Sequence, residues 1–94
     1  MNKNVIFTLH AKERAEERGA TLEEVLDVLR TGKTSSAKKG KYQKEKVFKF
    51  EQKWMGKFYK EKKVRIVYTE EEGNIVIITV YVFYGKWSEE EESK

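Results

Sequence analysis

The chain has 94 residues, a formal net charge of +4, one histidine and no cysteine. This length predicts one domain with a single modest core, and the composition excludes a disulfide framework, a thiol nucleophile and a cysteine-rich metal site. The longest apolar run, 75–84, is too short to cross a bilayer, and no signal peptide is evident. We therefore expect a soluble, cytoplasmic protein with no membrane contact, no bound metal and no cofactor.

The N-terminal part of the chain predicts a short strand and a first helix. Residues Val5–Phe7 favour a strand, and Thr8 after them is a suitable helix N-cap. The helix is expected from Leu9 to Arg18 and ends at Gly19, a residue that favours the turn after a helix. Its small alanines, Ala11 and Ala15, would allow close packing against a neighbouring element.

A second helix follows almost immediately. Thr21 and Glu24, three residues apart, form a capping box, and Gly32 ends the segment. Its apolar residues recur with a helical period. The predicted core joins that helix to the later strands through Leu22, Val25, Leu26, Leu29, Val64, Ile66, Ile75, Ile77 and Val80.

From Tyr42 onward the apolar period changes to two, which indicates strands. In chain order we expect a loop at 34–40, a strand at 42–54, a turn at Met55–Gly56, turn or edge positions at 60–63, a strand at 64–68, a turn at 71–74 and a last strand at 75–84. This last strand is apolar on both faces, which predicts the central position in the sheet.

Two helices followed by consecutive strands predict an α+β domain over residues 1–87. The two N-terminal helices would pack on one face of an antiparallel sheet of three to four strands. The remaining residues, 88–94, hold four consecutive glutamates and are expected to form a disordered acidic tail.

Charge is strongly segregated along the chain. Residues 33–65 contain thirteen basic and three acidic residues, a net charge of +10. A basic segment interleaved with aromatic residues indicates nucleic-acid contact, in which cations meet phosphates and rings stack on unpaired bases. The expected contact residues are Arg18, Lys49, Trp54, Lys57, Tyr59, Lys62, Lys63, Tyr84 and Lys86. Two alternatives stay open: the lysines protect sheet edges from aggregation, and the tryptophans Trp54 and Trp87 pack in the core or at its edge.

The first helix places His10, Arg14 and Arg18 on one face at steps of four residues. One titratable ring beside two permanent cations suits the binding and processing of a phosphate group. Metal-free RNA cleavage needs a base, an acid and cations on the phosphate. His10 would be the proton carrier, with Arg14, Arg18 and Arg65 on the phosphate.

The alternatives for these residues are structural. Glu13 and Glu17 could neutralise the helix arginines, His10 could bond to the backbone, and Arg65 could pair with Glu70 or Glu51. A site shared by His10, Arg14 and Arg65 further requires that Arg65 lie on the helix-covered sheet face or at its rim. If Val64 and Ile66 face the helices, Arg65 points to the opposite side.

Several short motifs resemble domain-of-unknown-function family 4258 over residues 6–87. They are His10-x3-Arg14, the segment from Arg18-Gly19-Ala20-Thr21 to Glu24-Val25, Gly56–Tyr59, Lys63–Tyr68, Ile78–Tyr81 and Tyr84–Trp87. The resemblance implies a fold similar to that of the RelE and BrnT toxins, which are small α+β endoribonucleases of toxin–antitoxin pairs. It implies roles for Arg65 and for Tyr81 or Tyr84, and an antitoxin protein as a partner.

Three functions are therefore expected as alternatives. The first is a metal-free endoribonuclease of the toxin–antitoxin type that uses His10, Arg14, Arg65 and Tyr81. The second is a nucleic-acid-binding module without catalysis, and the third is a protein-interaction domain whose basic face meets an acidic partner.

Overall fold

The computed structural model describes residues 4–36, 38 and 40–87. Its elements in chain order are β1 (Asn4–Phe7), α1 (Leu9–Arg18), α2 (Leu22–Thr31), β2 (Lys33–Ser36), β3 (Tyr42–Trp54), β4 (Lys57–Glu71) and β5 (Asn74–Gly85). The predicted bounds of both helices are confirmed. The expected acidic tail, 88–94, lies outside the described residues.

The five strands form one mixed sheet in the order β1-β5-β4-β3-β2. Strand β1 runs parallel to β5, and the other neighbours are antiparallel. The prediction of three to four antiparallel strands is therefore wrong in both strand number and direction. The difference arises at the two edges of the sheet. Strand β1 is added there beside β5, and Lys33 and residues 34–36 of the predicted loop pair with β3.

Strand β4, not β5, is the middle strand of the sheet. Residues 60–63, predicted as turn or edge positions, continue β4 without a break and pair with β5 from Glu61 onward. Their charge is compatible with a central strand because the side chains alternate between two environments. Lys62 points toward the helices and is buried, whereas Lys63 points to the opposite face.

Threonine side chains fix the start of each helix. The Thr8 hydroxyl accepts a hydrogen bond from the Ala11 amide and donates one to the Ile77 carbonyl, both at 3.0 Å, so the cap also ties α1 to β5. The predicted capping box of α2 is confirmed, since Thr21 and Glu24 exchange hydrogen bonds of 3.0 Å. Gly19 ends α1 in the left-handed conformation with φ of 89°.

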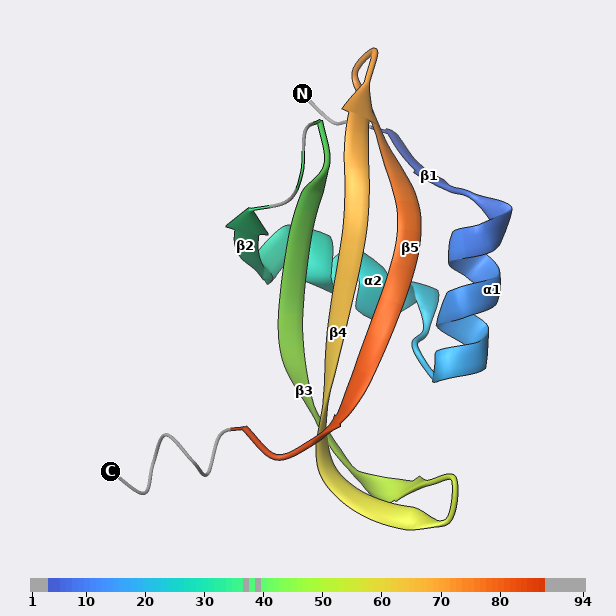
Figure 1. Cartoon of the computed structure of the whole chain (residues 1–94), viewed down its shortest axis with the longest axis vertical. Coiled ribbons are helices and arrows are strands. Elements are labelled where there is room, and N and C mark those ends of the chain that lie inside the picture. The colour runs from blue at the N-terminus through green and yellow to red at the C-terminus, as the bar shows by residue number, and fades with distance from the viewer. Residues whose placement is uncertain (1–3, 37, 39, 88–94) are drawn as a thin grey trace.

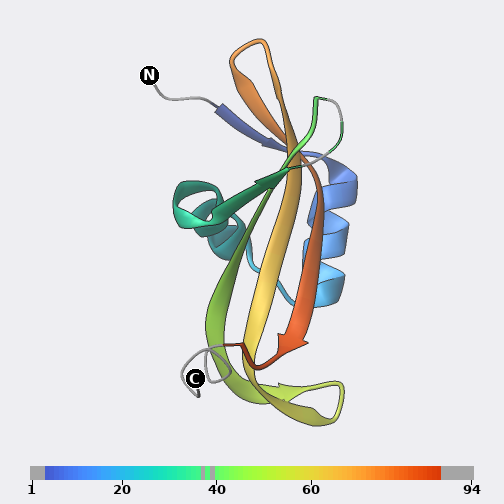
Figure 2. The ribbon, with the colours of Figure 1, turned by 60° about the vertical axis from the view of Figure 1, so that its left-hand side comes forward.

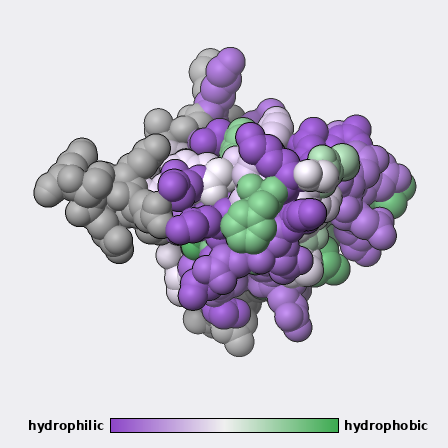
Figure 3. Space-filling model, turned by 90° about the horizontal axis from the view of Figure 1, so that it is seen from below, coloured by the Kyte–Doolittle hydropathy of each residue, from purple (hydrophilic) through white to green (hydrophobic). Residues whose placement is uncertain are grey.

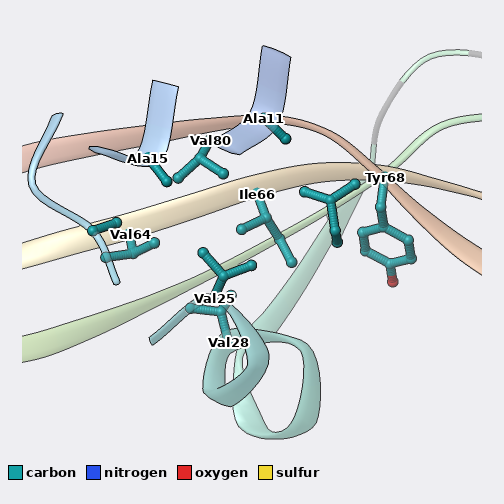
Figure 4. Packing of buried hydrophobic residues seen from close by; sticks show 10 residues of the cluster. Ala11, Ala15, Val25, Val28, Val64, Ile66, Tyr68 and Val80 are labelled. Carbon is teal, nitrogen blue, oxygen red and sulfur yellow. The ribbon is translucent and has the colours of Figure 1, made fainter. Parts of the chain in front are cut away.

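Both helices lie on the same side of the sheet (Figure 1). The core fills the space between the helix layer and the sheet (Figure 4). The fully buried large side chains come from α2, β4 and β5, and they are Val25, Val28, Val64, Ile66, Ile77 and Val80. Leu29 and Ile75 pack against this cluster as partly buried residues. The prediction for Leu22 is wrong, because 43% of this residue is exposed. Leu26 is only partly buried, and Val28 was missed.

A bulge in β5 explains its apolar pattern. Val67 pairs with Thr79 but Tyr68 pairs with Ile77, so Ile78 is an extra residue. The bulge reverses the alternation, and both Ile77 and Val80 therefore face the helices. The other face of β5 is not covered by a helix. The apolar residues on that face therefore do not mean that β5 is buried on both sides.

A buried ammonium group joins the turn between the helices to the sheet. Lys62 is 5% exposed, and its Nζ lies 2.8 Å from both the Gly19 carbonyl and the Glu24 carboxylate. The Tyr84 hydroxyl donates to the Arg18 carbonyl at 2.6 Å. These contacts satisfy the end of α1 and hold the start of α2 on β4.

Strands β3 and β4 extend past the helices and twist around each other at their connecting turn (Figures 1 and 2). The surface seen from that end is mainly hydrophilic and carries a hydrophobic patch (Figure 3). Met55 and Phe58 are the large exposed apolar side chains next to the turn, at 83% and 54% exposure.

A substitution at Ile66 tests the packing between the helices and the sheet. Ile66→Ala should lower the free energy of unfolding by about 2–5 kcal/mol, because it opens a cavity at a fully buried position. Leu22→Ala is the control at an exposed site and should change it by less than about 1 kcal/mol. Chemical denaturation of both variants checks the prediction, and equal effects would contradict this core.

The ionisation of the Tyr84 hydroxyl should make the protein less stable at high pH. Burial, assisted by the charge of Glu24, raises the pKa of Tyr84 from 10.0 to about 12. The unfolded chain therefore releases the phenolic proton at a lower pH than the folded chain, and the free energy of unfolding should fall as the pH rises from about 10 to about 12.

Tyr84→Phe supplies the comparison, since it lacks this proton while Tyr68 still titrates. The variant should be less stable at neutral pH, because the hydrogen bond to Arg18 is lost, but should lose less stability between pH 10 and pH 12. Denaturant unfolding across this range measures both effects. Parallel pH profiles for the two proteins would refute the assignment.

Candidate nucleic-acid interface

The sheet face turned away from α1 and α2 is called the open face. The strand register aligns its residues in rows across β3, β4 and β5. Glu45, Arg65 and Tyr81 form one row, and Val47, Lys63 and Phe83 form the next. A further row contains Lys49, Glu61 and Gly85. The open face therefore combines basic, acidic and aromatic side chains at adjacent positions.

Arg18 connects α1 to this open face. Strand β1 pairs with β5 only as far as Ile77, so the backbone edge of β5 beyond that point is free to bond to α1. Arg18 Nη1 donates to the Val80 carbonyl at 2.7 Å, and its guanidinium lies over the Tyr81 ring, 5.1 Å from the centroid. The helix thus places a cation at the edge of the open face.

Arg65 lies in the middle of the open face. Its guanidinium is 4.8 Å from the centroid of the Phe83 ring, and its Nε donates to Glu45 at 2.9 Å. The same carboxylate lies 3.8 Å from Lys63 Nζ. Arg65 does pair with a glutamate, as the structural alternative expected, but the partner is Glu45 and not Glu70 or Glu51. One carboxylate shared by two cations leaves these two neighbouring rows, taken together, with an excess of positive charge.

Trp87 completes the open face beyond the end of β5. Its backbone amide donates to Glu61 at 2.6 Å, and Lys63 Nζ lies 4.9 Å from the centroid of its ring. A side chain built at Gly85 would meet the Trp87 ring at 3.4 Å. The indole therefore occupies the space that the missing side chain of Gly85 leaves.

The predicted site shared by His10, Arg14 and Arg65 is wrong. Val64 and Ile66 are fully buried against the helices, so Arg65 between them points to the open face. His10 is exposed on α1, and Arg14 pairs with Glu17 at 3.0 Å. Of the predicted helix stripe, the residue with contacts on the open face is Arg18.

Several predicted nucleic-acid contacts serve packing instead. Lys62 is buried below the helices, and its prediction as a phosphate contact is wrong. Trp54 stacks on Tyr84 with ring centroids 5.0 Å apart, and Tyr59 lies 5.5 Å from the Tyr84 ring. This agrees with the packing alternative for Trp54. Phe50 also contacts Tyr84, so these rings form a cluster below the turn between α1 and α2.

The remaining predicted contacts divide between two places. Lys49 and Lys63 lie on the open face with Arg65 and Tyr81. Lys57 and Lys86 instead line, together with Tyr59 and Tyr84 of the ring cluster, a hollow of about 510 Å³ where β4 begins and β5 ends. The sequence therefore predicted a continuous basic surface, whereas the fold separates its residues between the two sheet faces and the end of the sheet.

Phe83 and Glu45 were missed as members of the site. The available signal was the alternation of β5, which places Phe83 on the same face as Tyr81. This alternation is not visible in the sequence, because apolar residues occur on both faces of β5. Glu45 could not be identified without the register between β3 and β4, which places it directly opposite Arg65.

Within the ranges that the structure describes, no group of three or more metal-ligating side chains lies together. No helix in those ranges is long and apolar enough to span a membrane. The open face presents guanidinium, ammonium and carboxylate groups, a phenol hydroxyl and aromatic rings.

Comparison with known proteins identifies a family without assigning an activity. No curated protein and no solved structure gives a significant match to the chain. A family model described as Domain of unknown function (DUF4258) matches residues 7–82. This match includes both helices, and it covers β4 and most of β5. The chain therefore belongs to the DUF4258 family.

Proposed function

We propose that this protein binds RNA through the open face of its sheet. The observation that carries the proposal is that Arg18 of α1 and Lys63 and Arg65 of β4 lie together on a sheet face that neither helix covers. Arginine and lysine side chains neutralise phosphates and release condensed counterions. Exposed Tyr81 beside them adds a hydroxyl group and a ring that can contact the sugar and base.

The charge distribution of the fold supports this assignment of the interface. On the helix side, Lys46 is held by Asp27 at 2.7 Å, and Lys62 is held by Glu24 at 2.8 Å. These two lysines contribute to the basic composition of the chain but are committed to internal contacts. Arg65 and Lys63 share one carboxylate, so the open face keeps positive charge that can bind phosphate.

Salt dependence tests the binding function. Affinity for RNA should fall steeply with salt, and Arg65→Ala should weaken binding and reduce the slope of log K against log salt by about one. The control is Arg30→Ala, which removes an exposed arginine from α2 on the other side of the sheet. It should leave that slope unchanged.

Fluorescence anisotropy with labelled RNA at several salt concentrations measures these slopes. Equal effects of the two substitutions would show that the open face is not the interface. No binding of the wild-type protein at low salt would refute the function and favour the protein-interaction alternative.

We propose RNA cleavage as a second function, with a fold related to that of the RelE and BrnT toxins. The supporting observation is that Arg18 lies over the Tyr81 ring and Arg65 is directly opposite Tyr81 in the register. In such a reaction the 2′-oxygen, after losing its proton to water, attacks the adjacent phosphorus. The bond from phosphorus to the 5′-oxygen breaks, and that oxygen takes a proton from Tyr81.

The two arginines would stabilise the negative charge on the phosphate during this step. Tyr81 would recover its proton from solvent. A protein that acts as a toxin would also need an inhibitory partner, and an antitoxin that covers the open face fits this proposal.

Three variants test cleavage separately from binding. Tyr81→Phe and Arg65→Gln should each reduce the cleavage rate by at least about a hundredfold, the scale for loss of a proton donor or an electrostatic contact. His10→Ala should leave it nearly unchanged, because His10 has no part in this site. Gel analysis of RNA fragments after incubation gives the rates. Loss of cleavage in His10→Ala alone would instead restore His10 as the proton carrier.

A further inference from the structure

We infer that the open face binds an unpaired, extended strand, with successive bases stacked on a row of three aromatic rings. This inference rests on the proposed function and names its substrate class. The row consists of Tyr81, Phe83 and Trp87, whose indole lies over Gly85. Residues 81, 83 and 85 share one face of β5, so the three rings follow the strand at intervals of two residues.

The spacing of the rings selects an unstacked strand. Positions two residues apart in an antiparallel strand are about 6.8 Å apart, which is twice the rise of about 3.4 Å between stacked bases. Neighbouring bases of a helical duplex therefore cannot stack on neighbouring rings. A single strand can extend until its bases match the rings, because no pairing holds them at the shorter distance.

Each ring in the row has its own cation. Arg18 lies 5.1 Å from the Tyr81 centroid, Arg65 lies 4.8 Å from Phe83, and Lys63 Nζ lies 4.9 Å from Trp87. The rings keep surface for a ligand, since Tyr81 and Phe83 are each 40% exposed. Each position therefore offers both a stacking surface for a base and a positive charge for the adjoining phosphate.

Aromatic residues of the basic middle segment are less suited to this role. Trp54, Phe50 and Tyr59 all pack on Tyr84, and Tyr42 stacks on Tyr68 with centroids 5.5 Å apart. These rings stabilise the fold. The rings of the open face instead contact cations from other elements and retain exposed area.

The first experiment compares single-stranded and double-stranded RNA of the same length at one salt concentration. A duplex has the higher charge density and would bind more tightly to a purely electrostatic surface. We expect the opposite order, with single-stranded oligouridylate bound at least tenfold more tightly than the duplex. Affinity should rise steeply up to three nucleotides and slowly thereafter. A duplex bound as tightly as the single strand would overturn the inference.

The second experiment removes the rings one at a time. Phe83→Leu and Tyr81→Leu keep apolar side chains but lose the stacking surface, and each should weaken binding of single-stranded RNA by roughly 5- to 100-fold. Tyr81→Phe keeps the ring and should lose less affinity than Tyr81→Leu. The matched control is Phe58→Leu, which removes an exposed ring near the β3–β4 turn and should have no effect.

The outcomes separate this inference from the function on which it rests. If Phe83→Leu and Tyr81→Leu bind as wild type while Arg65→Ala is weakened, the face binds RNA electrostatically and the stacking inference is wrong. If the wild-type protein binds no RNA, both proposals fail. A loss in both leucine variants, with Phe58→Leu unchanged, supports the stacked single strand.

Discussion

The alternation of side chains along β4 determines both the core and the candidate site. Val64 and Ile66 point to the helices and are fully buried, and Lys63 and Arg65 between them must point to the opposite face. The same strand therefore supplies the centre of the core and two of the cations of the open face. A shift of β4 by one residue would place Arg65 in the core, so selection for the core also fixes the position of the site.

Lys62 is the exception in this pattern, because it places a charge on the buried side. The cost of burying an ammonium group is offset by its contacts with Glu24 and the Gly19 carbonyl. These contacts secure the turn between α1 and α2, and the position of α1 in turn places Arg18 beside Tyr81. A buried contact on one face of the sheet thus supports the geometry of the other face.

Local signals made the helices predictable from the sequence. Thr8, Thr21 and Gly19 cap the helices through contacts with residues only a few positions away, which the sequence alone reveals. The strand order was not predictable in the same way. Pairing of β1 with β5 joins residues about seventy positions apart, and the bulge at Ile78 reverses a pattern that otherwise appears regular. The charged run at 60–63 was misassigned because periodicity does not show which lysine finds a buried partner.

The candidate site was predictable only in part, for the same reason. Arg65, Tyr81, Lys63 and Arg18 were identified by residue type and by family resemblance, but their arrangement depends on register. His10 was selected as the only histidine, yet α1 packs through Ala11 and Ala15 on the side of the sheet away from Arg65. Residue chemistry thus gave the members of the site, and strand pairing decided which of them meet.

The central claim is that the open face is the interface for nucleic acid. Titration of the isotope-labelled protein with a short single-stranded RNA, followed by amide chemical shifts, tests it most directly. The account predicts that the largest shifts fall in residues 79–87 and 63–67. Shifts confined to α1, α2 or the turn between β3 and β4 would contradict it.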